Sequence, residues 1–467
     1  MTATHPLWIL ASAEAHASAS AIPGVQTAIF AGILVLTLAL LAAEKIHKTI
    51  LVLLSAGLCL FLGDALGYFP HGEGHHLPVY VEMIEWEVIG IVVGATVFVE
   101  IAARSGVFTW ISIKVLKASG GDPFRLLILF SILTAVFSAF LDNITAMIII
   151  GSLTIVSCRK LEIDAKPFLI TEGIMTNVGG LLTLISSIPN IIIGKTAGIS
   201  YLTFLIVSVP YTVFAIAASM FVARWAFGKA VAPLVGAEAR KHNRELVLAF
   251  DEWETVEDRR FFYTSSFAVV AVILLFALHS QIPILRDFGI EIVALGAGVI
   301  MMLLHAKDVE HDLSNVQWSL VFFFLGLFTI IGVMEKAGVL LKIGEVLSVL
   351  TSRTGSVGLM WLTALFSSVT DNIPLAAMLA KIFGPTPDAV AAVPADQWWA
   401  VVFGANLGGN ITPIGSASTV VAVTIMKKNN LKVTFLEFVK IGAVFAAVQL
   451  VLASGYLFIL QRILAES

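Results

Sequence analysis

The chain has 467 residues, of which 58% are hydrophobic and 13% charged, and its net charge at pH 7 is −4. So few charged side chains cannot cover the surface of a water-soluble domain, and a weakly acidic chain without a basic stripe is unsuited to nucleic acid. Its two cysteines, Cys59 and Cys158, lie in or beside apolar segments. They predict buried thiols and neither a disulfide framework nor a zinc site. The composition indicates an all-α, polytopic membrane protein.

Apolar segments that approach or exceed the ~20 residues needed to cross a bilayer recur along the chain. About ten spans are predicted: 25–43, 49–68, 86–103, 167–200, 204–228, 261–279, 288–305, 318–335, 398–425 and 434–461. Two further apolar stretches, 124–157 and 356–384, are each broken by an Asp-Asn pair. Each stretch is either one long span or a re-entrant hairpin.

The distribution of Lys and Arg favours two hairpins. With both stretches as hairpins, the main basic loops all lie in the cytoplasm, as the positive-inside rule requires; these loops are 44–48, 104–125, 159–166, 229–260 and 427–432. Loops without Lys or Arg then lie outside, at 1–24, 71–78 and 385–397. The exceptions on the outer side are Arg286, Lys336, Lys342, Arg353, Lys381 and Arg462. Residues 1–24 are thus predicted as an external segment and 229–260 as a cytoplasmic linker carrying a surface helix.

The chain also contains an internal duplication. LTAVFSAFLDNI at 133–144 and LTALFSSVTDNI at 362–373 share eight of twelve residues at a shift of 371 − 142 = 229. The same shift aligns TNVGGLLT from Thr176 with ANLGGNIT from Ala405. The predicted repeats, 25–228 and 261–461, each hold five spans and one hairpin. Because five is odd, the second repeat is inserted upside down, as in many secondary transporters.

Two kinds of polar motif lie at membrane depth in each repeat. Asp and Asn favour helix starts over helix interiors, so each Asp-Asn pair predicts a hairpin tip followed by a half-helix. The segments NVGGLLTLISSIPN and NLGGNITPIGSAST interrupt the spans 167–200 and 398–425, and such interruptions direct half-helix ends at a cavity. One such motif alone is usually packing or a capped loop. Two copies at one shift favour a central site. Glu172, about two turns into its span, is either a site residue or an interfacial residue, and the interface is favoured.

The paired DNI tips, TNVGG…IPNIIIG and GANLGGNITPIGS resemble the arsenite-efflux and sodium–proton antiporter permeases (ArsB/NhaD type). These belong to the ion transporter superfamily, which also holds divalent-anion/sodium symporters and the melanosomal P protein. The resemblance covers nearly the whole chain, and its motifs are specific for the superfamily but not for a substrate. It implies a scaffold domain of outer helices, a transport domain of hairpins and broken helices, an elevator-like motion, and a homodimer as in several members.

Carried over residue by residue, the resemblance implies an ion or substrate site formed by both repeats: Asp142, Asn143, Thr145, Asn177, Gly179, Thr183, Asp371, Asn372, Asn406, Gly408, Thr412 and Ser416. Two departures stand out. The run 186–190 reads SSIPN where P-protein-like members have GDPPN, so one carboxylate is missing. The symporters' Ser-Asn-Thr hairpin signature is replaced by Asp-Asn-Ile-Thr, which counts against carboxylate uptake because two fixed anions repel a divalent anion.

The sequence carries no ATP-binding motif and no acidic metal cluster. We expect no cofactor and no resident metal, and an ion gradient or a separate ATPase subunit as the energy source. The first hypothesis is proton-coupled efflux of arsenite or antimonite across the inner membrane, because As(OH)₃ suits a site of amides and hydroxyls. Buried Asp142 and Asp371 would then carry the proton. Sodium–proton antiport is second, and cation-coupled transport of an organic or inorganic anion third.

Two other classes of function are disfavoured. Paired intramembrane aspartates also occur in proteases, but a protease needs no inverted repeat of two whole motifs. A passive channel is disfavoured because hairpins and broken helices in inverted repeats are typical of alternating access. The expected partners are therefore a small ion or metalloid, protons or Na⁺, and membrane lipid, with no nucleic acid.

Overall fold

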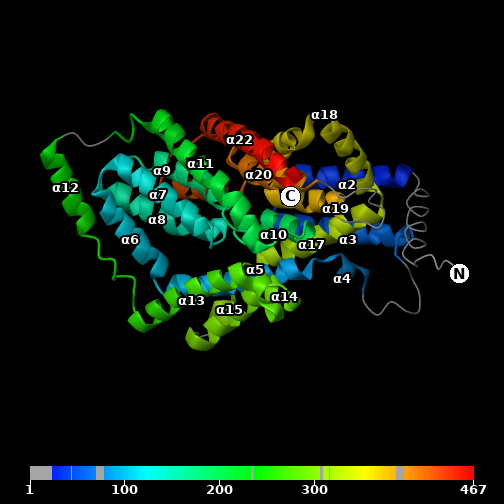
Figure 1. The fold of residues 1–467 in the computed structure, drawn as a ribbon, viewed down its shortest axis with the longest axis horizontal. Helices are drawn as coiled ribbons and strands as arrows, with labels where there is room; N and C mark the ends of the chain where they lie inside the picture. The colour runs from blue at the N-terminus through cyan, green and yellow to red at the C-terminus, as the bar shows by residue number, and fades with distance from the viewer. Residues whose placement is uncertain are drawn as a thin grey trace.

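The structure is a computed structural model that describes residues 24–43, 45–69, 78–232, 236–305, 309–314, 316–384 and 394–466. These residues form helices and loops without any strand, so the predicted all-α class is confirmed. Most helices run along the long axis of the molecule (Figure 1). The predicted external segment 1–24 and the outer loops at 71–78 and 385–397 lie almost entirely outside the described residues.

The described part of the first repeat contains ten helices, which include one hairpin and one interrupted span. They are α2 (Gly24–Ala43), α3 (Lys48–Ala65), α4 (Val79–Met83), α5 (Trp86–Arg104), α6 (Val107–Ser119), the hairpin α7 (Pro123–Ser138) and α8 (Asn143–Lys160), the interrupted span α9 (Lys166–Gly179) and α10 (Ile188–Thr196), and α11 (Tyr201–Phe227). The linker that follows carries α12 (Ala237–Leu248), which stands apart at one end in Figure 1.

The second repeat has the same order of long helices. It comprises α13 (Arg259–Leu278), the short η1 (His279–Gln281) and α14 (Pro283–Phe288), α15 (Ile290–His305), α16 (Val309–Ser314), α17 (Trp318–Lys336), α18 (Val339–Ser367), α19 (Asn372–Phe383), α20 (Ala395–Gly408), α21 (Ala417–Lys428) and α22 (Phe435–Glu466). Seven described helices are long and apolar enough to cross a membrane: α2, α3, α5, α11, α13, α17 and α22. Together with the shorter α15 and the two interrupted spans, they match the ten predicted spans.

The predicted spans omit two helices, α6 and the first part of α18. Neither has the continuous apolar run of ~20 residues that identifies a span, since Lys114 and Lys117 interrupt α6, and Lys342 and Glu345 interrupt α18. A kink at Gly355 divides α18 into two helices, and the second of them, Ser356 to Ser367, forms the first arm of the second hairpin. Gly355, with φ of 63° and ψ of −167°, separates the two parts of α18, a conformation that only glycine adopts readily.

Each Asp-Asn pair forms a hairpin tip, as expected. Asp142 is the N-cap of α8, and its side chain accepts hydrogen bonds from the backbone N–H groups of Ile144 and Thr145, both at 3.0 Å. Asp371 is the N-cap of α19 and accepts from the Ile373 N–H at 3.5 Å. The capping preference of Asp thus starts the second half-helix of each hairpin.

Helices of the two repeats pack closely against each other at glycine positions. A Cβ atom on Gly94 of α5 would lie 2.4 Å from the backbone of Ala294 in α15, and one on Gly326 of α17 would lie 2.9 Å from the Val52 side chain in α3. Gly94 and Gly326 are related by a shift of 232 residues (326 − 94). Small residues allow this close helix packing in membranes. A helix of each repeat is therefore packed against a helix of the other.

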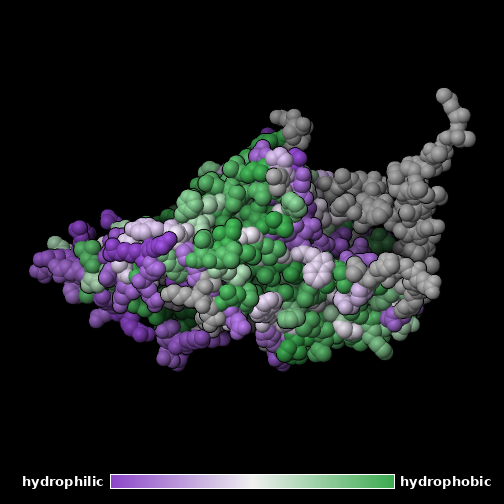
Figure 2. Space-filling model, turned by 90° about the horizontal axis from the view of Figure 1, so that it is seen from below, coloured by the Kyte–Doolittle hydropathy of each residue, from purple (hydrophilic) through white to green (hydrophobic). Residues whose placement is uncertain are grey.

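The surface has the distribution of a membrane protein. In Figure 2, hydrophobic side chains cover the middle of the molecule and hydrophilic ones gather at the end that holds α12. Many large apolar side chains are exposed, among them Phe221 of α11 and Phe267 of α13, both at 75%. Exposed apolar area on this scale marks contact with lipid. The chain is a multi-pass membrane protein.

The orientation predicts the result of cysteine labelling. A cysteine at exposed Ala395, in the stretch 385–397, should react with an impermeant maleimide from outside. One at exposed Glu238, on α12 in the linker, should react only after the inner face is opened. The native cysteines, Cys59 and Cys158, are both buried, so the background should be low. Labelling of both engineered sites from one side would contradict the inverted arrangement.

Candidate functional site

The tip of each hairpin is pinned to the broken helix of its own repeat by the same contacts. Ser138 Oγ donates to the Thr176 carbonyl at 2.6 Å, and its counterpart Ser367 donates to the Ala405 carbonyl at 2.6 Å. The predicted site residues Thr183 and Thr412 do likewise: their hydroxyls donate to the carbonyls of Ala139 and Ser368, at 2.6 and 2.5 Å. These two threonines hold the breaks against the tips.

The two breaks also contact each other by hydrogen bonds that cross between the repeats. Asn177 Nδ2 donates to Ser416 Oγ at 2.8 Å, while Ser187 Oγ donates to Asn406 Oδ1 at 2.9 Å. The two pairs are equivalent under the 229-residue shift, since 406 − 177 = 229 and 416 − 187 = 229. The predicted site residues Asn177 and Ser416 are therefore in direct contact, and Asn406 contacts the other break at Ser187.

A chain of buried amides extends this contact in both directions. Asn143 Nδ2 donates to Asn177 Oδ1 at 3.3 Å, and Asn177 Nδ2 donates to Asn410 Oδ1 at 2.8 Å. Asn410 Nδ2 donates in turn to Gln449 Oε1 at 2.9 Å. On the other side, Asn406 Nδ2 donates to Asn190 Oδ1 at 2.8 Å. Satisfied buried networks are rigid, so these amides set the geometry of the two breaks.

Three members of this network were missed as site residues. Asn190 and Asn410 lie in the motifs IPN and GGNIT, which interrupt the two spans. Their place in these motifs could have identified them as site residues. Gln449 is a single amide in an apolar span, which is a weak sequence signal. Its hydrogen bond with Asn410 shows that it belongs to the network. Glu172, expected at the interface, is fully buried in α9, because the helix runs between α7 and α21 rather than along the surface.

The carboxylate of Asp142 is surrounded by neutral groups. Besides its two backbone donors, Asp142 accepts from Thr145 Oγ1 at 2.6 Å and from Gln317 Nε2, before α17, at 3.5 Å. No cation lies within ion-pair distance of it among the described residues. Half-buried carboxylates without a counter-ion attract a proton or a metal cation. Asp142 and Thr145, both predicted site residues, thus bring carboxylate and hydroxyl oxygens together at the first hairpin tip.

The carboxylate of Asp371 has a fixed counter-ion instead. Lys48 Nζ, at the start of α3, lies 3.2 Å from Asp371 Oδ2 and 5.3 Å from the ring centroid of Phe323. The Lys48 side chain is 40% exposed, against 19% for Asp371, so the lysine is the more accessible partner of the pair. From the sequence, Lys48 was only one of the basic residues of a cytoplasmic loop. The ion pair joins that loop to the second tip.

A cavity of about 350 Å³ opens at this ion pair. Its volume is at the lower end of the ~300–1,000 Å³ typical of small-molecule sites. One side is formed by residues around the start of α3 and by α17, including Lys48 and Phe323, and the other by Ile144, Asp371 and the start of α21 at Ser416 and Ala417. The cavity thus touches both hairpin tips and one break.

Only some of the predicted site residues line this cavity. Asp371 and Ser416 do, whereas Asn143, Asn177, Asn406, Thr183 and Thr412 form the hydrogen-bonded support behind it. Asn372 is buried at the start of α19. Gly179 and Gly408 lie where a Cβ would meet the carbonyls of Ala135 and Ala364, at 2.3 and 2.2 Å.

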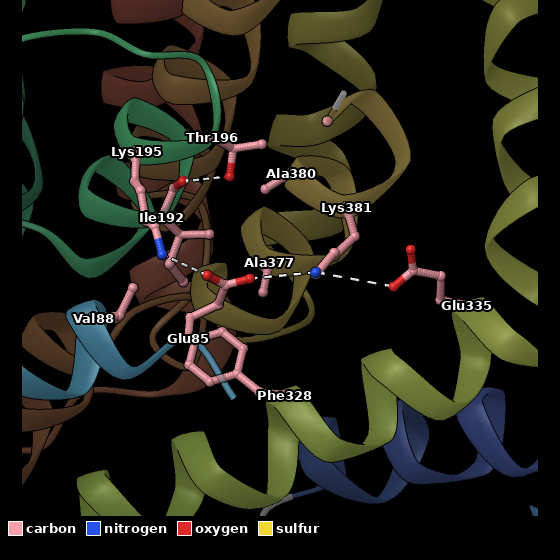
Figure 3. A pocket seen from close by; sticks show the side chains of 11 residues that line it. Glu85, Val88, Ile192, Lys195, Thr196, Phe328, Glu335, Ala377, Ala380 and Lys381 are labelled. Atoms are coloured by element: carbon pink, nitrogen blue, oxygen red, sulfur yellow. Dashed lines mark hydrogen bonds and ion pairs between the residues drawn. The ribbon is translucent and has the colours of Figure 1, made fainter. Parts of the chain in front are cut away.

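A second polar cavity, of about 310 Å³, lies at the other end of α19. Figure 3 shows Lys195 of α10 and Lys381 of α19 pointing toward the Glu85 carboxylate, with Glu335 of α17 beyond Lys381. The nitrogen–oxygen distances from Glu85 are 2.7 Å to Lys195 and 3.3 Å to Lys381. The outer ion-pair cluster, defined as Glu85, Lys195, Lys381 and Glu335, joins the ends of α5 and α17 to the broken helix and the second hairpin.

Loss of one acid from this cluster should destabilise the protein in a pH-dependent way. Burial raises the pKa of Glu85, but hydrogen bonds and charge from Lys195 and Lys381 outweigh burial and hold the pKa below its usual value. Its stabilisation is therefore present above the ordinary Glu range and is lost as pH falls through the lowered pKa. We expect Glu85→Gln to cost on the order of 1 kcal/mol at pH 7.

The measurement is thermal unfolding of the purified protein in detergent from pH 7 down to about pH 2, because the loss of stabilisation falls below the ordinary Glu pKa of about 4.3. Exposed Glu82→Gln is the control. The denaturation temperatures of wild type and Glu85→Gln should converge at the acidic end. A constant difference across this range would mean that the cluster contributes nothing through the Glu85 charge.

Comparison with known proteins agrees with this architecture. Residues 38–404 match a family described as citrate transporter (CitMHS). The chain is 31% identical over 433 residues to an uncharacterized transporter of Mycobacterium tuberculosis, covering 90% of this chain and 96% of that one. It is 30% identical to a 46 kDa membrane protein of Mycobacterium leprae, over 91% and 97% of the two chains.

Two further matches are more distant. The chain is 27% identical to the human P protein over 93% of its own length but 59% of that protein's length. The crystal structure of the YdaH transporter of Alcanivorax borkumensis, which has an unusual topology by its own description, superposes with a TM-score of 0.59 over 88% of this chain and 98% of that one. At 12% identity this match concerns the fold alone.

Proposed function

The chain belongs to the citrate transporter family and is a secondary transporter, and from this premise we propose that it carries a small carboxylate-bearing anion together with a cation. The observation that carries the proposal is the Lys48–Asp371 ion pair at the wall of the 350 Å³ cavity. A substrate carboxylate can replace Asp371 as the partner of the Lys48 ammonium group, which is already partly exposed. Citrate is the first candidate, because the family is named for it.

The start of α21 supports an anion at the same place. Ser416 is the N-cap of this helix, and Ser416 and Ala417 both line the cavity. Backbone N–H groups at a helix N-terminus, together with the helix dipole, favour a negative group. A carboxylate could therefore be bound between Lys48 on one wall and the start of α21 on the other.

The objection to carboxylate transport, that two fixed anions repel the substrate, is weakened by the same ion pair. Lys48 neutralises Asp371, so Asp142 is the remaining uncompensated charge at the tips. A cation bound at Asp142 and Thr145 would neutralise it and make anion binding depend on the cation. This dependence is what couples two fluxes in a secondary transporter.

Two alternatives from the sequence remain open proposals. Arsenite, a neutral hydroxy acid, suits the buried amides and hydroxyls but makes no use of Lys48. Sodium–proton antiport is favoured by one observation, the position of the Thr145 hydroxyl 2.6 Å from the Asp142 carboxylate, since hydroxyl and carboxylate oxygens are ligands that hard cations prefer. The narrower kinship with the ArsB/NhaD group likewise stays a prediction.

The test is transport by the purified chain in proteoliposomes. Uptake of radiolabelled citrate, other di- and tricarboxylates and arsenite is measured under imposed H⁺, Na⁺ or Mg²⁺ gradients, and Na⁺/H⁺ exchange is followed with an internal pH dye. We expect saturable, cation-dependent uptake of a carboxylate. Arsenite flux or Na⁺/H⁺ exchange without any carboxylate uptake would overturn the proposal.

Lys48→Gln refines this test. A hydrogen bond to a charged group contributes about 1.5–3 kcal/mol, so its loss should raise the half-saturating anion concentration about 10- to 100-fold. Lys45→Gln, in the same loop but exposed, is the matched control and should behave as wild type. An unchanged anion affinity in Lys48→Gln would remove the lysine from the site.

A further inference from the structure

We propose that Glu172 is a second proton-binding site of the transport cycle, separate from the aspartates at the hairpin tips. Glu172 lies in the middle of α9 and is fully buried. Its Oε1 atom accepts a hydrogen bond from Thr154 Oγ1 of α8 at 2.6 Å, and its Oε2 atom has no hydrogen-bond partner in the described part of the chain. A desolvated carboxylate oxygen without any partner is costly unless it bears a proton.

Among the residues that the structure describes, no opposite charge forms an ion pair with this carboxyl group. The helices packed against α9 are α7, α8, α11, α20, α21 and α22. Their described charged residues lie in the first or last two turns: Arg125, Arg159, Lys160, Arg224, Asp396, Lys427, Lys428, Glu437, Lys440 and Arg462. None of them forms an ion pair with Glu172. The titratable group that faces it is Cys158 of α8, which is also buried.

Comparison of the two repeats shows whether the fold needs a carboxyl group at the position of Glu172. The positions equivalent to Glu172 and Thr154 in the second repeat, at the 229-residue shift, are Val401 and Phe383. Val401 is fully buried in α20 just as Glu172 is in α9. The broken-helix architecture is therefore built with an apolar pair in one repeat, so the fold itself does not require a carboxyl group at Glu172.

Short contacts lead from Glu172 to the cavity. The carbonyl of the next residue, Gly173, accepts from Ser418 Oγ at 3.2 Å, and Ser418 Oγ lies 3.1 Å from Ser416 Oγ. Ser418 also donates to Asn177 Oδ1 at 3.2 Å. Ser416 lines the cavity. A change of charge at Glu172 would therefore act on the helix contact between α9 and α21, directly behind the substrate wall.

The inference rests on the proposed coupling to a cation and makes the proton one of the coupled ions, whatever anion is carried. Protonation neutralises Glu172 without any further reactant, and release of that proton leaves a buried carboxylate that must regain one. The cycle would then take up one proton at Glu172 on one side of the membrane and release it on the other.

The experiment compares Glu172→Gln with wild type in proteoliposomes, using radiolabelled citrate, or arsenite if the wild type shows counterflow of arsenite only. Glutamine keeps the shape but cannot ionise. We expect counterflow at equal concentrations to survive, whereas proton-driven accumulation falls at least about tenfold, within the range of ligand–ligand coupling energies. The pH dependence of transport should flatten. Glu100→Gln, another acid in an apolar helix, is the control.

Thr154→Val gives a second, independent readout. The Thr154 hydroxyl donates to Oε1 and so favours the ionised carboxylate. The variant removes this donor and leaves the titratable group in place. The pH midpoint of transport should therefore move to higher pH. Wild-type pH dependence in both Glu172→Gln and Thr154→Val would overturn the inference. Absence of carboxylate transport in the wild type would overturn the proposed cargo alone.

Discussion

Replacing Gly179 or Gly408 by alanine is expected to abolish transport while the protein still inserts into the membrane. A Cβ atom would lie 2.3 Å from the Ala135 carbonyl oxygen at Gly179, and 2.2 Å from the Ala364 carbonyl oxygen at Gly408. Both contacts are with backbone, which cannot rotate away. The hairpin must therefore separate from the broken helix, and the hydrogen bonds that pin tip to break are strained.

We expect transport to fall about 100-fold or more in either variant, because a displacement near 1 Å at a binding site can cost this much. The larger valine should act in the same way. Gly296→Ala and Gly455→Ala are matched controls, since a Cβ at these helical glycines meets nothing within 4 Å. Counterflow rates and membrane content are measured for all variants. Normal transport by Gly179→Ala and Gly408→Ala would reduce the two breaks to packing elements.

Replacing either hairpin-tip aspartate by asparagine should abolish accumulation against a gradient. Asparagine keeps the size of the side chain and one acceptor for the helix cap, but it can neither bind a proton nor offer a charge to a cation. Because Asp142 has neutral partners, Asp142→Asn should remove the dependence on the coupling cation and leave part of the substrate exchange. The accumulation ratio and the counterflow rate are both measured, and a loss of coupling lowers the first more than the second.

Asp371→Asn should behave differently, because the variant leaves Lys48 without its counter-ion. We expect the anion to bind more tightly and to leave more slowly, so that counterflow falls while the half-saturating concentration drops. The double variant Lys48→Gln with Asp371→Asn should restore part of the exchange rate. If both single variants still accumulate substrate with the wild-type cation dependence, the aspartates serve folding and not coupling.

The sequence alone predicted most of the helical architecture. Spans, hairpin tips and breaks each depend on short local patterns: apolar length, Asp and Asn as helix caps, and glycine or proline in a span. The duplication then related the two halves, and Asp142 and Asp371 are found as N-caps. The helices α6 and the first part of α18 were missed because charged residues shorten their apolar runs.

Only the tertiary structure determined which residues line the cavity beside the hairpin tips. Lys48 belongs by sequence to a basic loop, and its pairing with Asp371 spans 323 residues. Likewise Glu172 looks interfacial by its distance from the basic loop, yet the packing of α9 between α7 and α21 buries it fully. Local preference determined where helices start and stop in this protein. Which charges meet, and which are left without a partner, was decided by long-range packing, because neither depends on any interaction between neighbours in the chain.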